Sequence, residues 1–296
     1  MQTFLTINET KNCLFVLKKE GKKTGFVPTM GALHKGHLAL LERAKNENDI
    51  VVCSIFVNPL QFNDKKDLEK YPRTLEKDAE LLKSAGCDIL FAPSSEEMYP
   101  PSPIRPPSGS QEADKQGKGN PEAVPLGHLE LIMEGKHRPG HFQGVCVVVK
   151  KLFDIVEPQK AYFGEKDFQQ LAVIKHMVKE LMIPVEIVAC PTVREHDGLA
   201  MSSRNTLLSP EERNNASLIP KTLFRLETNK QKASVAELKK WVEEVMGNNP
   251  LLKLDYFEVV NAETLLPVKN WGDAKKLRAC IAVKTGNIRL IDNIPL

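Results

Sequence analysis

Two histidines with a short spacing, His34 and His37, are the residues of this sequence best suited to chemistry on a phosphate. They follow an apolar run, and the neighbouring Gly31 and Gly36 would let the backbone approach a ligand closely. The amphipathic run after them predicts a helix whose first N–H groups would face an anion. Residues 24–37 therefore predict a strand, a nucleotide-cradling loop and the start of a helix.

The residues around the two glycines exclude one class of phosphate loop. Gly31 and Gly36 are spaced as at the start of a P-loop, but His37 and Leu38 stand where that loop needs Lys followed by Ser or Thr. The His-x-Gly-His spacing of residues 34–37 instead resembles that of the adenylate-forming nucleotidyl transferases, in which two histidines meet the triphosphate of ATP. The four residues alone leave a second interpretation open, a helix-capping turn with two solvated histidines.

Length and composition predict two domains and no general affinity for nucleic acid. The 296 residues exceed one minimal core, and 41 Lys and Arg against 38 Asp and Glu leave a net charge of only +3. The six cysteines lie far apart, so the sequence indicates no zinc or redox pair, and we expect them to be small buried residues in a reducing cytosol. No apolar run approaches the ~20 residues that cross a bilayer, which predicts a soluble cytoplasmic protein without a membrane partner.

Strand-like and helix-like segments alternate through the first two-thirds of the chain. Helical periods at 75–85, 145–156 and 171–181 lie between apolar runs at 25–27, 50–57, 88–92, 160–163 and 185–189. This alternation predicts an α/β domain, a Rossmann-like parallel sheet covered on both faces, over residues 1–190. Residues 191–296 predict a smaller α+β domain with segregated elements, with helices near 210–227 and 233–247 and then strands at 254–260, 279–283 and 288–291.

Polar segments follow the predicted strands at equivalent positions. Because ligands bind outside the carboxyl ends of parallel strands, we expect these segments to converge on one crevice. Each of them alone is also consistent with an ordinary turn, and only their shared position favours a site. The segments are residues 28–30, 58–62, 92–94 and 164–167.

Two other segments interrupt the regular pattern. The Pro-rich insertion at about 101–123 has no apolar period and predicts a solvated surface loop, with a functional lid as the alternative. In the second domain, Ser202, Ser203 and Arg204 suit a phosphate clamp, since a guanidinium can engage two phosphate oxygens at once. A polar turn before a helix is the alternative for that segment.

Taken together, these motifs resemble the pantothenate synthetase (pantoate and β-alanine ligase) family along nearly the whole chain. The matching segments are residues 28–34 with Gly36 and His37, 56–59 with Gln61 and Phe62, 71–73, 138–142, 163–167 with Gln169 and Gln170, and 201–205. The resemblance implies an ATP-dependent ligation in two steps, in which the pantoate carboxylate forms an adenylate and pyrophosphate and the β-alanine amine then displaces AMP. The insertion is the main departure from the family pattern.

The resemblance also implies roles for individual residues. His34, His37, Lys166 and Arg204 would be catalytic, with His37 as a proton donor. Gln61, Gln170 and Asn58 would bind pantoate and β-alanine, Asp78 would contact Mg²⁺, and the protein would be a homodimer. The ATP site would comprise Met30, Gly31, Ala32, Leu33, His34, Lys35, Gly36, His37, Gly164, Glu165, Lys166, Asp167, Val193, Met201, Ser202, Ser203 and Arg204.

Three alternatives remain from the sequence. One is another adenylyl or cytidylyl transferase of the same superfamily, and the second is a truncated relative of the class I aminoacyl-tRNA synthetases. Length and the lack of a basic, aromatic stripe in the C-terminal segment disfavour the synthetase. The third is a catalytically silent nucleotide-binding relative, against which the joint presence of the four proposed catalytic residues argues.

Overall fold

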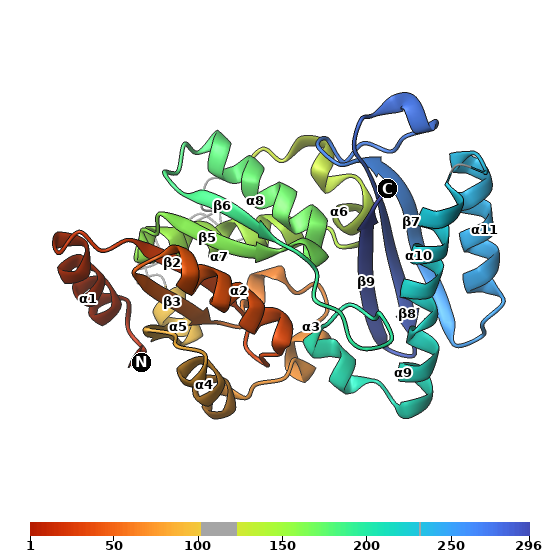
Figure 1. The fold of residues 1–296 in the computed structure, drawn as a ribbon. Helices are drawn as coiled ribbons and strands as arrows, with labels where there is room; N and C mark the ends of the chain where they lie inside the picture. Colours follow the sequence, from red (N-terminus) through yellow and green to blue (C-terminus); the bar gives the residue numbers. More distant parts are fainter. Residues whose placement is uncertain (102–122, 231) are drawn as a thin grey trace, which may run out of the picture.

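The computed structural model describes residues 1–101, 123–230 and 232–296, so most of the insertion expected at 101–123 lies outside the described residues. These residues form two β-sheets, of six and three strands, with helices packed on each (Figure 1). Among the helices of the described ranges, none is long and apolar enough to cross a membrane.

The larger sheet is parallel throughout and positions the candidate site. Its strands are β1 (Gln2–Phe4), β2 (Thr24–Thr29), β3 (Ile50–Ile55), β4 (Ile89–Phe91), β5 (Lys160–Gly164) and β6 (Glu186–Cys190). They lie in the order β1-β4-β3-β2-β5-β6, so the chain moves outward from β2 and then returns to place β5 on its other side. This reversal makes the carboxyl ends of β2 and β5 a topological switch point, where ligands of such sheets bind.

Helices cover both faces of this sheet. The helices of this part of the chain are α1 (Ile7–Lys19), α2 (Lys35–Glu47), α3 (Lys65–Lys70), α4 (Leu75–Ser84), α5 (Ser95–Met98), α6 (Met133–His137), α7 (His141–Val156) and α8 (Phe168–Glu180). Residues of α2 and α4 share one hydrophobic core with the sheet, and residues of α1, α7 and α8 share the other. Each core is closed because one apolar stripe of each helix meets a strand face.

The C-terminal part forms a separate antiparallel sheet. Its strands are β7 (Leu252–Asn261), β8 (Leu277–Thr285) and β9 (Ile288–Pro295), in the order β7-β8-β9. The helices are α9 (Pro210–Ala216), α10 (Leu218–Asn229) and α11 (Val235–Gly247). Figure 1 shows α10 and α11 on the side of this sheet away from the six-stranded sheet, which leaves β9 next to the turn that follows β5.

The fold class expected from the sequence is confirmed, but its elements differ in part from those expected, and the helices α1, α3, α5 and α6 were not predicted. The strand β1 was not predicted, because a three-residue edge strand carries no readable alternation. The single helix expected near 210–227 is two helices, α9 and α10. Pro220 has no N–H to donate to the carbonyl oxygen of Ala216, and the helix is interrupted between these residues. The domain boundary at residue 190 stays a prediction.

Candidate active site

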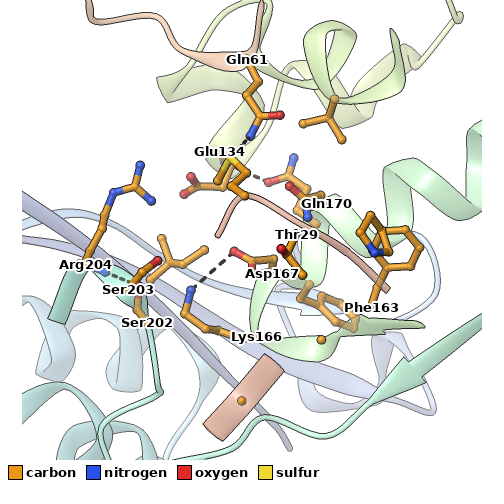
Figure 2. A pocket seen from close by; sticks show the side chains of 18 of the residues that line it. Thr29, Gln61, Glu134, Phe163, Lys166, Asp167, Gln170, Ser202, Ser203 and Arg204 are labelled. Carbon is orange, nitrogen blue, oxygen red and sulfur yellow. Dashed lines mark hydrogen bonds and ion pairs between the residues drawn. The ribbon is translucent and has the colours of Figure 1, made fainter. Parts of the chain in front are cut away.

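One cavity at the carboxyl ends of β2 and β5 brings together most of the predicted site residues. Figure 2 shows Lys166, Ser202, Ser203 and Arg204 around it together with Gln61 and Gln170. The predicted residues that line the cavity are Met30, His34, Gly36, His37, Asn58, Gln61, Gly164, Lys166, Asp167, Gln170, Val193, Met201, Ser202, Ser203 and Arg204. The predicted residues Gly31, Ala32, Leu33, Lys35, Glu165 and Asp78, all of them described, are not among its lining residues.

The loop between β2 and α2 is held in a strained conformation by Asp78. Gly31 and Ala32 have φ angles of 81° and 49°, in the left-handed region that L side chains rarely adopt. The buried carboxylate of Asp78 accepts hydrogen bonds from the backbone N–H groups of Ala32 and Leu33, both at 2.8 Å. Thr74 donates a third, at 3.1 Å. Asp78 thus fixes the loop. Its expected role as a magnesium contact stays a prediction, and a metal ion would compete with these three hydrogen bonds for the carboxylate oxygens.

The two histidines cap the helix α2 with one nitrogen each. The His34 Nδ1 accepts a hydrogen bond from the Gly36 N–H at 3.1 Å, and the His37 Nδ1 accepts one from the His34 N–H at 3.3 Å. A neutral imidazole carries its single proton on the other nitrogen, so both rings present Nε2–H. The ring centroids are 4.1 Å apart. The capping turn and the phosphate site, which were alternatives in the sequence, are therefore compatible in one structure.

Burial keeps both rings neutral in the free protein. It lowers the pKa of His34 to about 4, with Lys166 adding to the effect, and lowers the pKa of His37 to about 3, with His34 adding to it. A neutral ring still donates through Nε2–H, but neither ring is a cation at pH 7 before an anion binds. The proton-donor role implied for His37 thus requires a bound phosphate that raises its pKa.

We expect His34 and His37 to stay neutral from pH 8 down to about pH 5 in the free protein. A histidine with an ordinary pKa of about 6.5 would instead be mostly protonated at pH 5. The measurement is an NMR titration of the imidazole Cε1–H signals, assigned with His34→Gln and His37→Gln variants. Added ATP should move both transitions to higher pH, whereas a transition near pH 6.5 in the free protein would contradict the neutral pair.

Cations from two distant segments face the same cavity. The side chain of Lys166 lies 3.6 Å from the Asp167 carboxylate and is 19% exposed. Arg204 donates to the Asp67 carboxylate at 2.9 Å, and its guanidinium lies over the ring of Tyr71. Ser202 caps the turn before Arg204 by accepting its backbone N–H at 3.2 Å. Cations and hydroxyls so placed suit a bound triphosphate.

The amide of Gln61 is oriented by Asn58. The Asn58 side chain, 1% exposed, donates to the Gln61 Oε1 at 3.2 Å and to the Gly144 carbonyl oxygen at 3.0 Å. Its own oxygen accepts from the Tyr99 hydroxyl and the Leu60 N–H. With its groups already occupied, Asn58 supports Gln61, whose amino group points to the Met30 sulfur and the cavity. The direct substrate contact proposed for Asn58 stays a prediction.

The turn that carries Gln61 lies against the backbone of α7. A Cβ added at Gly144 would come within 2.3 Å of the Leu60 carbonyl oxygen, a distance no real side chain tolerates. Only glycine at this position lets the helix and the turn approach so closely. The wall of the cavity behind Gln61 is therefore set by two backbones in contact.

Magnesium has no ready protein cage here. Among the residues that the structure describes, no cluster of three or more His, Cys, Asp or Glu side chains is placed to hold a metal ion. Mg²⁺ usually keeps several waters and binds through one or two carboxylates and the substrate phosphates. The residues present fit a metal that arrives on a nucleotide better than one that the protein binds alone.

Comparison with known proteins decides the family. A family model described as pantoate-beta-alanine ligase matches residues 2–295. The chain belongs to the pantoate-beta-alanine ligase family. Pantothenate synthetase of Bacteroides fragilis is 50% identical over 294 residues, which cover 99% of this chain and 98% of that protein.

Solved structures of the pantoate-beta-alanine ligase family share the whole fold. The pantothenate synthetase structure from Thermus thermophilus has a TM-score of 0.86 at 46% identity and covers 99% of both chains. A Francisella tularensis pantoate-beta-alanine ligase, complexed with beta-gamma ATP and beta-alanine, has a TM-score of 0.77 at 35% identity and covers 99% of this chain and 97% of that chain. The fold and the ligase activity predicted from the sequence are thereby confirmed.

In this member of the pantoate-beta-alanine ligase family the cavity borders on a buried ionic network that sequence reasoning missed. Glu134, 6% exposed, accepts two hydrogen bonds from Arg289, at 2.6 and 2.8 Å, and one from the Tyr256 hydroxyl at 2.9 Å. Arg138 lies 3.7 Å from Glu134 and donates to the His141 Nε2 at 3.0 Å. The matching 138–142 segment signalled this part of the site, but Arg289 and Tyr256 are too distant in sequence to be paired with it.

The network ends on the turn that presents Gln61. Since arginine only donates, the Nε2 of His141 must accept, and its Nδ1–H then donates to the Gln61 carbonyl oxygen at 2.8 Å. Burial, with the charge of Arg138 adding to it, lowers the pKa of His141 to about 4, so this tautomer persists at neutral pH. The network therefore holds the backbone of the Gln61 turn, while Asn58 holds the Gln61 side chain.

Proposed function

We propose that the chain makes pantothenate in two steps within this one cavity. Pantoate and ATP first give pantoyl adenylate and pyrophosphate, and the amine of β-alanine then attacks the acyl carbon and releases AMP. A carboxylate is a poor acceptor for an amine, and adenylation turns its oxygen into a leaving group. The observation that carries this proposal is that two cations, Lys166 and Arg204, and two amides, Gln61 and Gln170, line the same cavity.

The two sides of the cavity have complementary chemistry. The Nε2–H groups of His34 and His37, with Lys166 and Arg204, would meet the negative charge that develops on the phosphates. Gln61 and Gln170 would offer neutral, directional hydrogen bonds that match the carboxylate and hydroxyl oxygens of pantoate. This arrangement would place the pantoate carboxylate next to the α-phosphate, which converts a two-body encounter into a positioned reaction.

Three further features belong to the proposal. Mg²⁺ would enter with the nucleotide and neutralise part of the triphosphate charge. The resemblance favours a homodimer, which a mass near twice 33.1 kDa in sedimentation would support. We also propose that the enzyme works in the cytoplasm, where ATP is supplied.

The test of the two-step scheme is isotope exchange. Labelled pyrophosphate should enter ATP in the presence of Mg²⁺ and pantoate, without β-alanine, because the adenylate forms before the amine is used. Exchange that appears only after β-alanine is added would replace the scheme with a concerted ligation. Exchange without pantoate would indicate a different nucleotidyl transferase, and the absence of any exchange or ligation would indicate a silent relative.

A further inference from the structure

Two adjacent residues of β9, Asp292 and Asn293, connect the C-terminal sheet to the phosphate site. They are 3% and 4% exposed and both line the cavity, although β9 belongs to the smaller sheet. Successive side chains of a strand point to opposite faces, so the two can contact different partners. Neither residue was singled out by the sequence.

Asn293 holds the turn that carries Lys166. Its amide Nδ2 donates to the carbonyl oxygens of Glu165 and Lys166, each at 2.9 Å. Its Oδ1 accepts from Arg278 at 2.6 Å, and the same guanidinium donates to the Glu165 carboxylate at 3.0 Å. Arg278 also lies over the ring of Phe168, 4.2 Å from its centroid. Both N–H groups of one amide are thus used on consecutive carbonyls, which fixes the turn at the end of β5.

Asp292 holds the segment that leads to the second phosphate loop. Its carboxylate accepts two hydrogen bonds from Arg194, at 2.7 and 3.0 Å. Arg194 also donates to the Gly198 carbonyl oxygen at 2.9 Å and pairs with Ala200 in an isolated β-bridge. A planar guanidinium that is bound through both of its terminal nitrogens, Nη1 and Nη2, has little freedom to shift. Ala200 lies two residues before Ser202, so the position of this bridge determines the position of the loop that contains Ser202, Ser203 and Arg204.

We propose that Asp292 and Asn293 are positioning residues that together set the spacing between the two phosphate loops, Asn293 through Lys166 and Asp292 through Arg204. This inference rests on the proposed function, because it assumes that Lys166 and Arg204 meet the triphosphate. Neither β9 side chain needs to touch ATP. The C-terminal sheet then contributes to adenylation through its attachment to both loops.

The first test is Asn293→Asp, which keeps the acceptor for Arg278 but sets a carboxylate against two carbonyl oxygens. Single-turnover adenylate formation should slow about 100-fold, the effect of misplacing a catalytic group by about 1 Å. The matched control is Asn249→Asp, because the Asn249 side chain also donates to a neighbour, Asn215 at 2.7 Å, within the smaller domain. It should lose thermal stability comparably but keep the adenylation rate. If Asn293→Asp does not fold, Asn293→Ala carries the same prediction.

Double variants show whether each residue acts through its loop. Asn293→Asp should add less than about threefold to the defect of Lys166→Met, and Asp292→Asn should likewise add little to Arg204→Lys, because coupled groups are not additive. If the rate defects of the two single variants multiply fully in these matched pairs, the proposal is overturned. Equal coupling in the crossed pairs, Asn293→Asp with Arg204→Lys and Asp292→Asn with Lys166→Met, would overturn it as well. If the single variants Lys166→Met and Arg204→Lys leave the adenylation rate unchanged, the proposed phosphate site itself fails. If both of them slow adenylation strongly but the Asp292 and Asn293 variants do not, only the positioning role is overturned.

Discussion

Replacing Lys166 with methionine is expected to slow pantoyl adenylate formation by about 1,000-fold, the upper range for the loss of one electrostatic donor in an enclosed site. Methionine keeps most of the length of the side chain, up to the position of the last carbon, and removes the charge. Lys166 lies at the switch point, is largely buried, and has only Asp167 within ion-pair distance among the described residues. Because the charge acts on bound phosphate in both the ground and reacting states, the affinity for ATP should fall as well.

The matched control for this variant is Lys160→Met. Lys160 begins β5, the strand whose carboxyl end leads into the turn with Lys166, and it pairs with the half-buried Glu47 at 3.0 Å. For Lys160→Met, the adenylation rate from single-turnover kinetics and the ATP affinity from calorimetry should both be close to those of the unmodified enzyme. If Lys160→Met and Lys166→Met were equally impaired, the defect would come from the strand and not from a charge at the phosphates.

Arg204→Lys is expected to slow adenylation by about 100-fold while leaving ATP affinity in the absence of pantoate nearly unchanged. Lysine keeps the charge but loses the planar fork that can bind two phosphate oxygens. In the structure one terminal nitrogen of the guanidinium donates to Asp67 at 2.9 Å, so this carboxylate competes with a phosphate for the arginine. We therefore expect Arg204 to engage the triphosphate mainly in the reacting state, which affects the rate more than the binding step.

Two further variants test whether the contact with Asp67 delays the binding of Arg204 to the triphosphate. Asp67→Asn removes the competing carboxylate and should raise ATP affinity modestly, since Arg204 is then available earlier. Arg43→Lys is a surface control, because Arg43 forms its ion pair with Glu47 within α2, and it should change neither parameter. If Arg204→Lys lowers ATP affinity as much as it lowers the adenylation rate, Arg204 already binds nucleotide before the reacting state forms, and its release from Asp67 is not a separate step.

The sequence was sufficient for the parallel sheet because its signals are local. Each strand from β2 to β6 is a short apolar run next to a helical period, and in β2, β3 and β4 burial on both faces makes the run nearly continuous. The element errors also have local causes. A three-residue strand is too short to show a pattern, and Pro220 lies so near the start of α10 that the sequence alone did not reveal the break before it.

The site could be predicted only in part, because much of its support is long-range. The loops that carry His34, Lys166 and Arg204 are continuous motifs, and the structure brings them to one cavity. The groups that hold them are far apart along the chain, with a separation of 155 residues from Glu134 to Arg289 and of 127 from Lys166 to Asn293. An isolated polar residue in a strand such as β9 gives no local sign that its partner lies at the edge of another sheet.

The close contact between Gly144 and Leu60 has a consequence for substrate range. A pocket can usually be enlarged when a wall side chain is shortened or a loop moves back, but behind Gln61 the wall is backbone against backbone. Acceptance of a bulkier hydroxy acid should therefore come from replacing side chains that face the cavity, such as Met30, and not from relaxation of the turn. Selection for activity on bulkier hydroxy acids is expected to leave Gly144 and the Gln61 turn unchanged, while side chains that face the cavity are replaced.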